Sequence, residues 1–370
     1  MQENRPTSDQ DQDQFKLNLT TADGTRSYLE KYLSLNVESV ERLSGGFINF
    51  VWRAKLGTPY EGQNSIVVKH AEPFTAADSS LNVPVGRLKF EYDSLKMIGS
   101  ESSIAGEDAL ISVPSVYHHD NIKHVLIMQD VGTIPTLQDF MLSASPPPPT
   151  DIAALIGCQL ATFIAGLHNW GRNNESARAG LSANAYGRTV QDLCRYQKVV
   201  PNAIASGILD PLLSTVMAAL AETDKTSEET AIMGDFWTAN VLVNIEESAS
   251  GEKALKKMWI IDWEACRYGS PATDVGLFAG DCYLISRVHN EMAADAMRHS
   301  FLGTYATLAK VDPMEVVIYM GAYWIMWTYY EDIGEAEQRK RLAKGVEYIH
   351  RGWERSQQWL PLSLAQELLA

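Results

Sequence analysis

Alternation of apolar and polar positions in the first third of the chain predicts a small antiparallel sheet. It is clearest in residues 50–56, Phe-Val-Trp-Arg-Ala-Lys-Leu, which have the period of two that a half-buried strand requires. The turn Ser44-Gly45-Gly46 separates two strands within residues 40–56. Similar patterns predict further strands at residues 65–69, 112–118 and 124–128.

Helical spacing occurs on both sides of these first strands. Residues 20–35 place Leu29, Tyr32 and Leu33 on one face, and residues 85–98 predict a second helix, which carries Glu91. An order of strand, glycine turn, strands, helix and strands is typical of a small α/β lobe.

The pattern changes after Gln129-Asp130-Val131-Gly132, where a crossover between two lobes is expected. Residues 143–149 end in four prolines, which cannot continue a helix and favour an extended surface spacer. Thr150 or Asp151 is the expected N-cap of a long helix that ends near Trp170. The remainder predicts mainly helices, with short strands near residues 231–233, 241–244 and 257–262.

These patterns together predict an α+β protein of two lobes. Residues 1–18 have the polar composition of a disordered tail. Residues 19–131 would form the small lobe, an antiparallel sheet with one helix, and residues 132–370 the larger, mainly helical lobe.

Composition narrows the class of protein. Of 370 residues, 45% are hydrophobic and 21% are charged, as in ordinary globular proteins. The net charge of −15 and the lack of a basic stripe disfavour a nucleic-acid partner. Residues 1–16 hold no signal-peptide pattern and residues 316–330 are too short to span a bilayer. We therefore expect a cytoplasmic protein without a membrane partner, and nothing in the sequence indicates its oligomeric state.

The strongest chemical signal is a loop that carries Asp235 and, five residues later, Asn240. Short apolar segments flank this loop, so an Asp there can accept a hydroxyl proton or orient the hydroxyl toward a γ-phosphate. Asn240 is spaced to turn back toward a metal ion. The alternative is a polar β-turn without chemistry. Trp237 is unusual on an exposed loop, and we expect it to pack locally or to form a wall of the acceptor pocket.

A second signal follows the apolar segment Met258-Trp259-Ile260-Ile261. Asp262 ends this expected strand, where a carboxylate is costly to bury unless it is bonded or binds a cation, and Glu264 is near enough to share a metal. A strand-end Asp that faces water is the alternative. For Asp274 we expect a structural role, capping a helix and bracing the loop of Asp235 by hydrogen bonds.

Candidate phosphate contacts lie in the small lobe. Gly45 and Gly46 would let the backbone approach a phosphate, although a simple hairpin turn is the alternative and the Walker A pattern is absent. Lys69 ends an apolar strand and can reach phosphates when a helical Glu holds it, for which Glu91 is the expected partner.

For two further groups of side chains, the sequence favours core packing over catalysis or substrate binding. His168 follows an apolar stripe on a helix, so we expect it to be packed and hydrogen-bonded. Tyr323, Trp324 and Trp327 lie at helical spacing, for which core packing is the first interpretation and an aromatic acceptor pocket the alternative.

The combination of Gly-Asp-x-x-x-x-Asn at residues 234–240, Ile-Ile-Asp-Trp-Glu at 260–264 and Asp274 resembles the aminoglycoside phosphotransferase and choline kinase superfamily. Within it, the chain is similar to the methylthioribose kinase branch. A closer resemblance, to fungal kinases of hydroxyindoles, lies in residues 42–49, 126–132 and 280–287. The resemblance implies a bilobal, protein-kinase-like fold.

The resemblance also implies an ATP- and Mg²⁺-dependent kinase with Asp235 as the catalytic residue. The metal would be held by Asn240, Asp262 and Glu264. The nucleotide would be contacted by Gly45, Gly46, Asn49, Lys69, Glu91, Asp262, Trp263, Glu264 and a hinge of Gln129, Asp130 and Val131.

The acceptor implied by the resemblance is the hydroxyl of 4-hydroxytryptamine or a related hydroxyindole, with 5-methylthioribose as the alternative. A catalytically silent pseudokinase or a scaffold is disfavoured, because Lys69, Asp235 and Asp262 are all present. Met233 and Phe236 stand where the superfamily usually has His and Leu. These departures predict different packing of the loop and the same chemistry.

Overall fold

The computed structural model describes residues 17–369 except 45, 106–109, 144–146, 250 and 252. Most of the predicted tail and part of the proline-rich spacer lie outside the described residues. The chain divides into two compact units. The first comprises Met1–Lys89 and Val116–Asp130, and the second comprises Phe90–Ser115 and Val131–Ala370.

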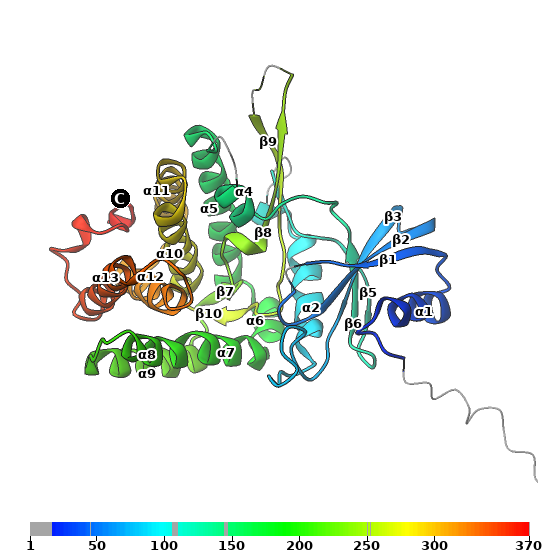
Figure 1. The fold of residues 1–370 in the computed structure, drawn as a ribbon, viewed down its shortest axis with the longest axis horizontal. Coiled ribbons are helices and arrows are strands. Elements are labelled where there is room, and N and C mark those ends of the chain that lie inside the picture. Colours follow the sequence, from blue (N-terminus) through cyan, green and yellow to red (C-terminus); the bar gives the residue numbers. More distant parts are fainter. Residues whose placement is uncertain are drawn as a thin grey trace, which may run out of the picture. The chain divides into compact units, whose positions relative to one another are not determined.

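The first unit is built on a five-stranded antiparallel sheet in the order β1-β2-β3-β6-β5 (Figure 1). Its strands are β1 (Val37–Arg42), β2 (Phe50–Tyr60), β3 (Gln63–His70), β5 (Val116–Asp120) and β6 (Val125–Gln129). Glu61 and Gly62, with φ of 49° and 76°, make the two-residue turn between β2 and β3.

Helix α1 (Ala22–Leu33) belongs to this unit and begins after Thr21, whose side chain accepts a hydrogen bond from Gly24 N. Tyr28 and Leu29 are fully buried in the same core as Trp52, Ile66 and Val68 of the sheet. Tyr32, expected on the buried face, is instead 48% exposed.

The second unit contains two small sheets. β8 (Val241–Glu247) pairs antiparallel with β9 (Lys253–Ile260), and β9 also pairs parallel with β4 (Ile111–Ser112). β7 (Thr230–Ile232) pairs with β10 (Arg267–Gly269), a strand that the sequence pattern did not predict. The strand expected over residues 112–118 is wrong as a single element, because the chain is interrupted around Pro114, which has no N–H to donate.

Helices make up most of the second unit (Figure 1). The longer ones are α5 (Thr150–Arg172), α9 (Pro211–Thr226), α10 (Ala272–Val288), α11 (Glu291–Leu308), α12 (Pro313–Thr328) and α13 (Glu335–Trp353). The shorter ones are α3 (Ser102–Ala105), α4 (Leu137–Ser143), α6 (Glu175–Leu181), α7 (Ala185–Gln191), a π-helical turn η1 (Asp192–Tyr196) and α8 (Gln197–Ala205). Helix α2 (Arg87–Gly99) crosses the boundary between the units, and Glu91 belongs to the second.

Helix α5 is a central core element of this unit. It packs closely on α11, and Gly157 permits this approach. A Cβ at Gly157 would lie only 2.2 Å from the carbonyl oxygen of Met297. Pro149, and neither Thr150 nor Asp151, occupies its N-cap position, with the extended φ of −56° and ψ of 138°. By length and hydropathy α5 could also cross a bilayer, but 56% of that apolar window is buried, as is common for core helices.

The predicted α+β class is confirmed by these elements: a small antiparallel sheet with a helix, followed by a mainly helical region.

Candidate active site

The loop of Asp235 leaves strand β7 through Met233 and Gly234 and enters β8 after a short 3₁₀ turn, η2 (Thr238–Asn240). Gly234 has a φ of +82°, and a Cβ there would lie 2.6 Å from the carbonyl oxygen of Ala265. Only glycine combines this backbone conformation with this close approach. The local sequence therefore sets the sharp turn that presents Asp235.

Asp274 anchors the start of this loop. Its Oδ2 accepts a hydrogen bond from Met233 N and its Oδ1 one from Gly234 N, both at 2.8 Å. His168 Nε2 lies 3.2 Å from Asp274 Oδ2, and its Nδ1 lies 2.8 Å from the hydroxyl of Tyr305. His168 and Asp274 are fully buried. The expected bracing role of Asp274 and the packed state of His168 are confirmed; the expected helix cap is wrong, because Pro271 occupies the N-cap of α10.

Asp235 is held by donors on both carboxylate oxygens. Arg195 Nη2 donates to Oδ1 at 2.8 Å, and Asn240 Nδ2 donates to Oδ2 at 3.0 Å and to the backbone oxygen of Asp235 at 2.9 Å. The predicted pair Asp235 and Asn240 is thus brought together, while Arg195 was not foreseen. Its side chain comes from η1, 40 residues away, so no local motif indicates it.

The charge of Asp235 is balanced by these neighbours. Although 35% of its side-chain surface is accessible, burial raises the pKa of this carboxyl above its ordinary value. The Arg195 guanidinium opposes that shift, and the Asp262 carboxylate adds to it. A carboxylate that is oriented, partly accessible and in a medium of low polarity suits proton acceptance from a hydroxyl.

Aromatic side chains secure the loop after Asp235. Phe236 is fully buried and stacks on Phe278, with ring centroids 5.1 Å apart. Trp237 stacks on Trp327 of α12 at 5.4 Å and 21°. Trp327 is 36% exposed, whereas Trp324 is fully buried, so the two tryptophans of α12 have different surroundings.

Asp281 of α10 is a second unforeseen residue beside this loop. It accepts hydrogen bonds from Thr238 N at 3.0 Å, from Thr238 Oγ1 and from the Tyr323 hydroxyl at 2.9 Å. Burial raises the pKa of Asp281, and these donors oppose the rise. Asp281 therefore fixes η2, and with it the position of Asn240.

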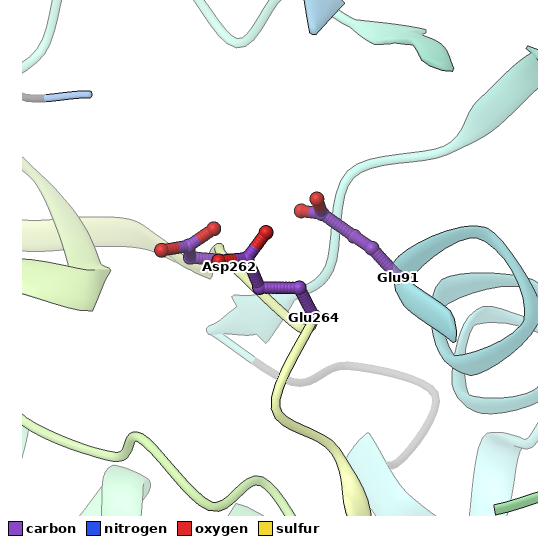
Figure 2. Close-up of side chains that lie close together, drawn as sticks. All are labelled: Glu91, Asp262 and Glu264. Carbon is purple, nitrogen blue, oxygen red and sulfur yellow. The ribbon is translucent and has the colours of Figure 1, made fainter. Parts of the chain in front are cut away.

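Three carboxylates converge beside the end of β9 (Figure 2). Glu91 of α2 points toward Asp262 and Glu264, and one oxygen of each lies within 4.8 Å of the others. Asp262 has a φ of +67°, the left-handed conformation that non-glycine residues seldom adopt. The Tyr186 hydroxyl donates to Glu264 Oε1 at 3.0 Å, which orients that side chain.

This donor set fits a divalent cation of the Mg²⁺ type. Carboxylate oxygens are its preferred protein ligands, and Glu91, Asp262 and Glu264 each offer one oxygen within 4.8 Å of the other two. The backbone of the two loops is joined where Ile261 N donates to Asn240 O at 2.9 Å. Because Asn240 uses its Nδ2 atom toward Asp235, its Oδ1 is the atom with which it would ligate a metal.

Trp263, expected near the nucleotide, has a fully buried indole whose Nε1 donates to Ile260 O at 2.9 Å. Its side chain packs edge-on against Phe163, with ring centroids 6.2 Å apart. The Trp263 side chain thus packs in the core beneath residues 260–264. A nucleotide could contact Trp263 only through its backbone.

The other expected nucleotide contacts lie in the first unit. Val131 is the exception, because it belongs to the second unit. Lys69 is 8% exposed on β3, opposite Val51 and Leu126. Asn49 Oδ1 accepts from Arg87 Nε at 2.8 Å. A Cβ at Gly46 would lie 2.8 Å from Asn49 O, so this turn requires glycine, and Gly45 lies outside the described residues.

The expected hinge begins with Gln129, the last residue of β6, opposite Ile66 of β3. The Asp130 carboxylate accepts from Arg53 Nε and Ser65 Oγ, both at 2.7 Å, so its side chain braces the sheet. The predicted hydrogen bonds to an adenine would therefore come from the backbone of residues 129–131. The nucleotide contacts, including a pairing of Lys69 with Glu91, stay predictions.

The chain is similar in sequence to known kinases. Residues 182–308, which include the loop of Asp235 and the segment of Asp262, match the ecdysteroid kinase-like family. The chain is 42% identical over 340 residues to a 4-hydroxytryptamine kinase of Psilocybe cyanescens, covering 90% of this chain and 93% of that protein. A 4-hydroxytryptamine kinase of Psilocybe cubensis is 41% identical with the same coverage.

Among solved structures, a choline/ethanolamine kinase family protein of Mesorhizobium loti aligns with a TM-score of 0.45 and 14% identity, covering 94% of this chain and 99% of that one. The identity to the curated kinases, extending over nearly the whole of each chain, decides the assignment. The protein is a small-molecule kinase, and it belongs to the family that includes the 4-hydroxytryptamine kinases of Psilocybe.

Proposed function

We propose that this kinase transfers the γ-phosphoryl group of ATP to the hydroxyl of 4-hydroxytryptamine or a related hydroxyindole. The observation that carries the proposal is the 42% identity to a 4-hydroxytryptamine kinase over 90% of the chain. The arrangement around Asp235 gives this assignment a chemical basis.

Asp235 would act on the acceptor hydroxyl. With Arg195 and Asn240 fixing its two oxygens, the carboxylate can receive the hydroxyl hydrogen and direct the oxygen in line with the phosphorus. A phenolic hydroxyl has a pKa of about 10, as in tyrosine, so it loses its proton more readily than an aliphatic alcohol. A weak carboxylate base is therefore sufficient when its orientation is fixed.

The stacked Trp237 and Trp327 favour an aromatic acceptor. Trp237 is two residues from Asp235 in the same loop, and its ring stacks on that of Trp327 with centroids 5.4 Å apart. Offset stacking of a planar ring on an aromatic pair contributes about 0.5–1.5 kcal/mol beyond simple burial. A neutral sugar such as 5-methylthioribose would gain little from such a surface.

For the donor side we propose that Asp262, Glu264 and the Oδ1 of Asn240 hold Mg²⁺, with Glu91 as the neighbouring carboxylate. The bound ion would neutralise charge on the β- and γ-phosphates of ATP. Gly46, Asn49, Lys69 and the backbone of residues 129–131 would hold the nucleotide.

The test is a transfer assay with purified full-length protein, γ-labelled ATP and Mg²⁺. We expect label on 4-hydroxytryptamine and none on tryptamine, which has the same ring and amine but no hydroxyl. Removing divalent cations with a chelator is expected to abolish transfer, and adding back Mg²⁺ to restore it.

Two outcomes would contradict parts of the proposal separately. Label on 5-methylthioribose alone would replace the acceptor and place the chain with the methylthioribose kinases. Full transfer to 4-hydroxytryptamine in the chelated sample would leave the acceptor intact and remove the metal role of Asp262 and Glu264.

A further inference from the structure

We propose that Arg195 is a positioning residue for phosphoryl transfer: it aims the Asp235 carboxylate at the acceptor oxygen, and a π-helical turn aims Arg195. The inference rests on the proposed role of Asp235. It concerns a residue that belongs to no motif of the sequence.

The contacts of Arg195 hold both the side chain and the backbone of the catalytic loop. Nη2 donates to Asp235 Oδ1 at 2.8 Å, and Nη1 donates to the backbone oxygen of Gly234 at 3.1 Å. Because the guanidinium is planar, two donors from one fork fix the direction of Asp235 relative to its own backbone. Asn240 fixes the other oxygen, so rotation of the carboxylate is restrained from both sides.

Arg195 is itself held in place. It is 9% exposed, and Nη1 also donates to Gln191 Oε1. The next residue, Tyr196, is buried with its hydroxyl 3.1 Å from that of Tyr319 on α12. Gln191 therefore holds the guanidinium, and Tyr196 holds the adjoining backbone against α12.

The backbone around Arg195 is unusual. The π-helical turn Asp192–Tyr196 lies between the α-helices α7 and α8. A π turn inserts an extra residue into a helix and so rotates the side chains that follow it, and such turns are frequent at functional sites. Here the turn directs two successive side chains, Arg195 and Tyr196, inward.

The charges around Asp235 make this contact important. Asp262 and Asp281 are both near enough to repel its carboxylate, whereas Arg195 is the cation that opposes them. Without the two hydrogen bonds from Arg195, the orientation of the Asp235 carboxylate would depend on repulsion by the neighbouring carboxylates and on the one hydrogen bond from Asn240. A misplacement of about 1 Å at a reacting group lowers rates about a hundredfold.

The experiment compares Arg195→Ala and Arg195→Lys with Arg188→Ala as the matched control. Arg188 lies on α7 seven residues earlier, and it donates to the backbone oxygens of Asp224 and Ser182 rather than to Asp235. We expect Arg195→Ala to lower kcat about a hundredfold with little change in the KM for ATP. Added guanidinium should restore part of this kcat, and the control should keep the wild-type value.

Arg195→Lys tests the fork itself, because a lysine keeps the charge but offers a single point of donation. We expect it to stay at least about tenfold below wild type in kcat. A wild-type kcat in Arg195→Lys or Arg195→Ala would overturn the proposal. So would a loss in Arg195→Ala that guanidinium does not restore and that is matched by a loss of thermal stability.

A double-mutant cycle with Asp235→Ala separates this inference from the proposed function. If Arg195 acts through Asp235, removing Arg195 has no further effect on kcat in the Asp235→Ala background. If Asp235→Ala alone retains full activity, the proposed role of Asp235 fails. If Asp235→Ala loses turnover and Arg195→Ala keeps the wild-type kcat, only the present inference fails.

Discussion

Asp235 and Asp274 are two carboxylates beside the same loop, and they differ in what surrounds them. Asp274 is fully buried and accepts two backbone N–H bonds from Met233 and Gly234, besides its contact with His168. Asp235 keeps 35% of its side-chain surface accessible and is held by two side chains, Arg195 and Asn240.

The difference separates a structural acid from a chemical one. Backbone donors cannot leave Asp274 without unfolding the loop, so its bonds contribute to stability. Side-chain donors restrain Asp235 but leave surface for a substrate. The comparison predicts that changes at the first acid act on stability, and changes at the second on turnover.

The largest effect is expected for Asp235→Asn. Replacing the carboxylate with a neutral amide removes the proton acceptor, so we expect kcat to fall at least about a hundredfold. Thermal stability should change little, because the site is partly accessible and Asn fills the same volume. A large fall in stability would contradict the distinction between the two acids.

Asp274→Asn is expected to act mainly on stability. Its NH2 group would face one of the two backbone N–H donors, which would then lack an acceptor; this costs about 1–3 kcal/mol for a buried group. We expect a lower Tm, measured against Asp332→Asn, an exposed position, as the matched control. Unchanged stability with lost turnover would reverse the assignment of the two acids.

Glu315 provides a smaller test of how burial acts on an acid. It accepts a bond from Ser270 Oγ at 2.9 Å, and burial raises its pKa from 4.5 to about 6. The folded state therefore binds more protons here than the unfolded chain. The stability from protonated Glu315 is complete below pH 4.5 and is lost as the pH rises through about 6.

Glu315→Gln, a neutral mimic of the protonated acid, should therefore be more stable than wild type at pH 8 by up to about 2 kcal/mol. The two proteins should have nearly equal stability at pH 4.5. Urea unfolding at both pH values, with exposed Glu335→Gln as the control, measures the difference. An equal gain at both pH values would exclude titration as its cause.

Much of the fold was predictable because its signals are local. Period-two alternation located β2, an apolar run located β3, and a glycine turn was predicted between β1 and β2. The spacing between Asp235 and Asn240 located a loop whose two side chains do bond. Asp262 and Glu264 followed from the same reasoning about a strand end. In each case neighbours in sequence are neighbours in space.

The remainder depends on contacts between distant segments. Arg195 reaches Asp235 across 40 residues, and Thr238 meets Asp281 across 43. β10 has three residues, too few to show a period, and is defined only by pairing with β7. The N-cap of α5 was misplaced because Thr150 and Asp151 are common caps, whereas Pro149 already had the required extended backbone.

Phe236 carries a consequence for how this loop can vary. Its ring packs with Phe278 of α10 and Phe301 of α11, whose centroids lie 4.4 Å apart. A leucine at this position would leave a void that the two helices would have to fill. The conformation of the loop consequently depends on the residues of α10 and α11 against which Phe236 packs. Grafting the loop alone into a protein without these two phenylalanines would not reproduce its conformation.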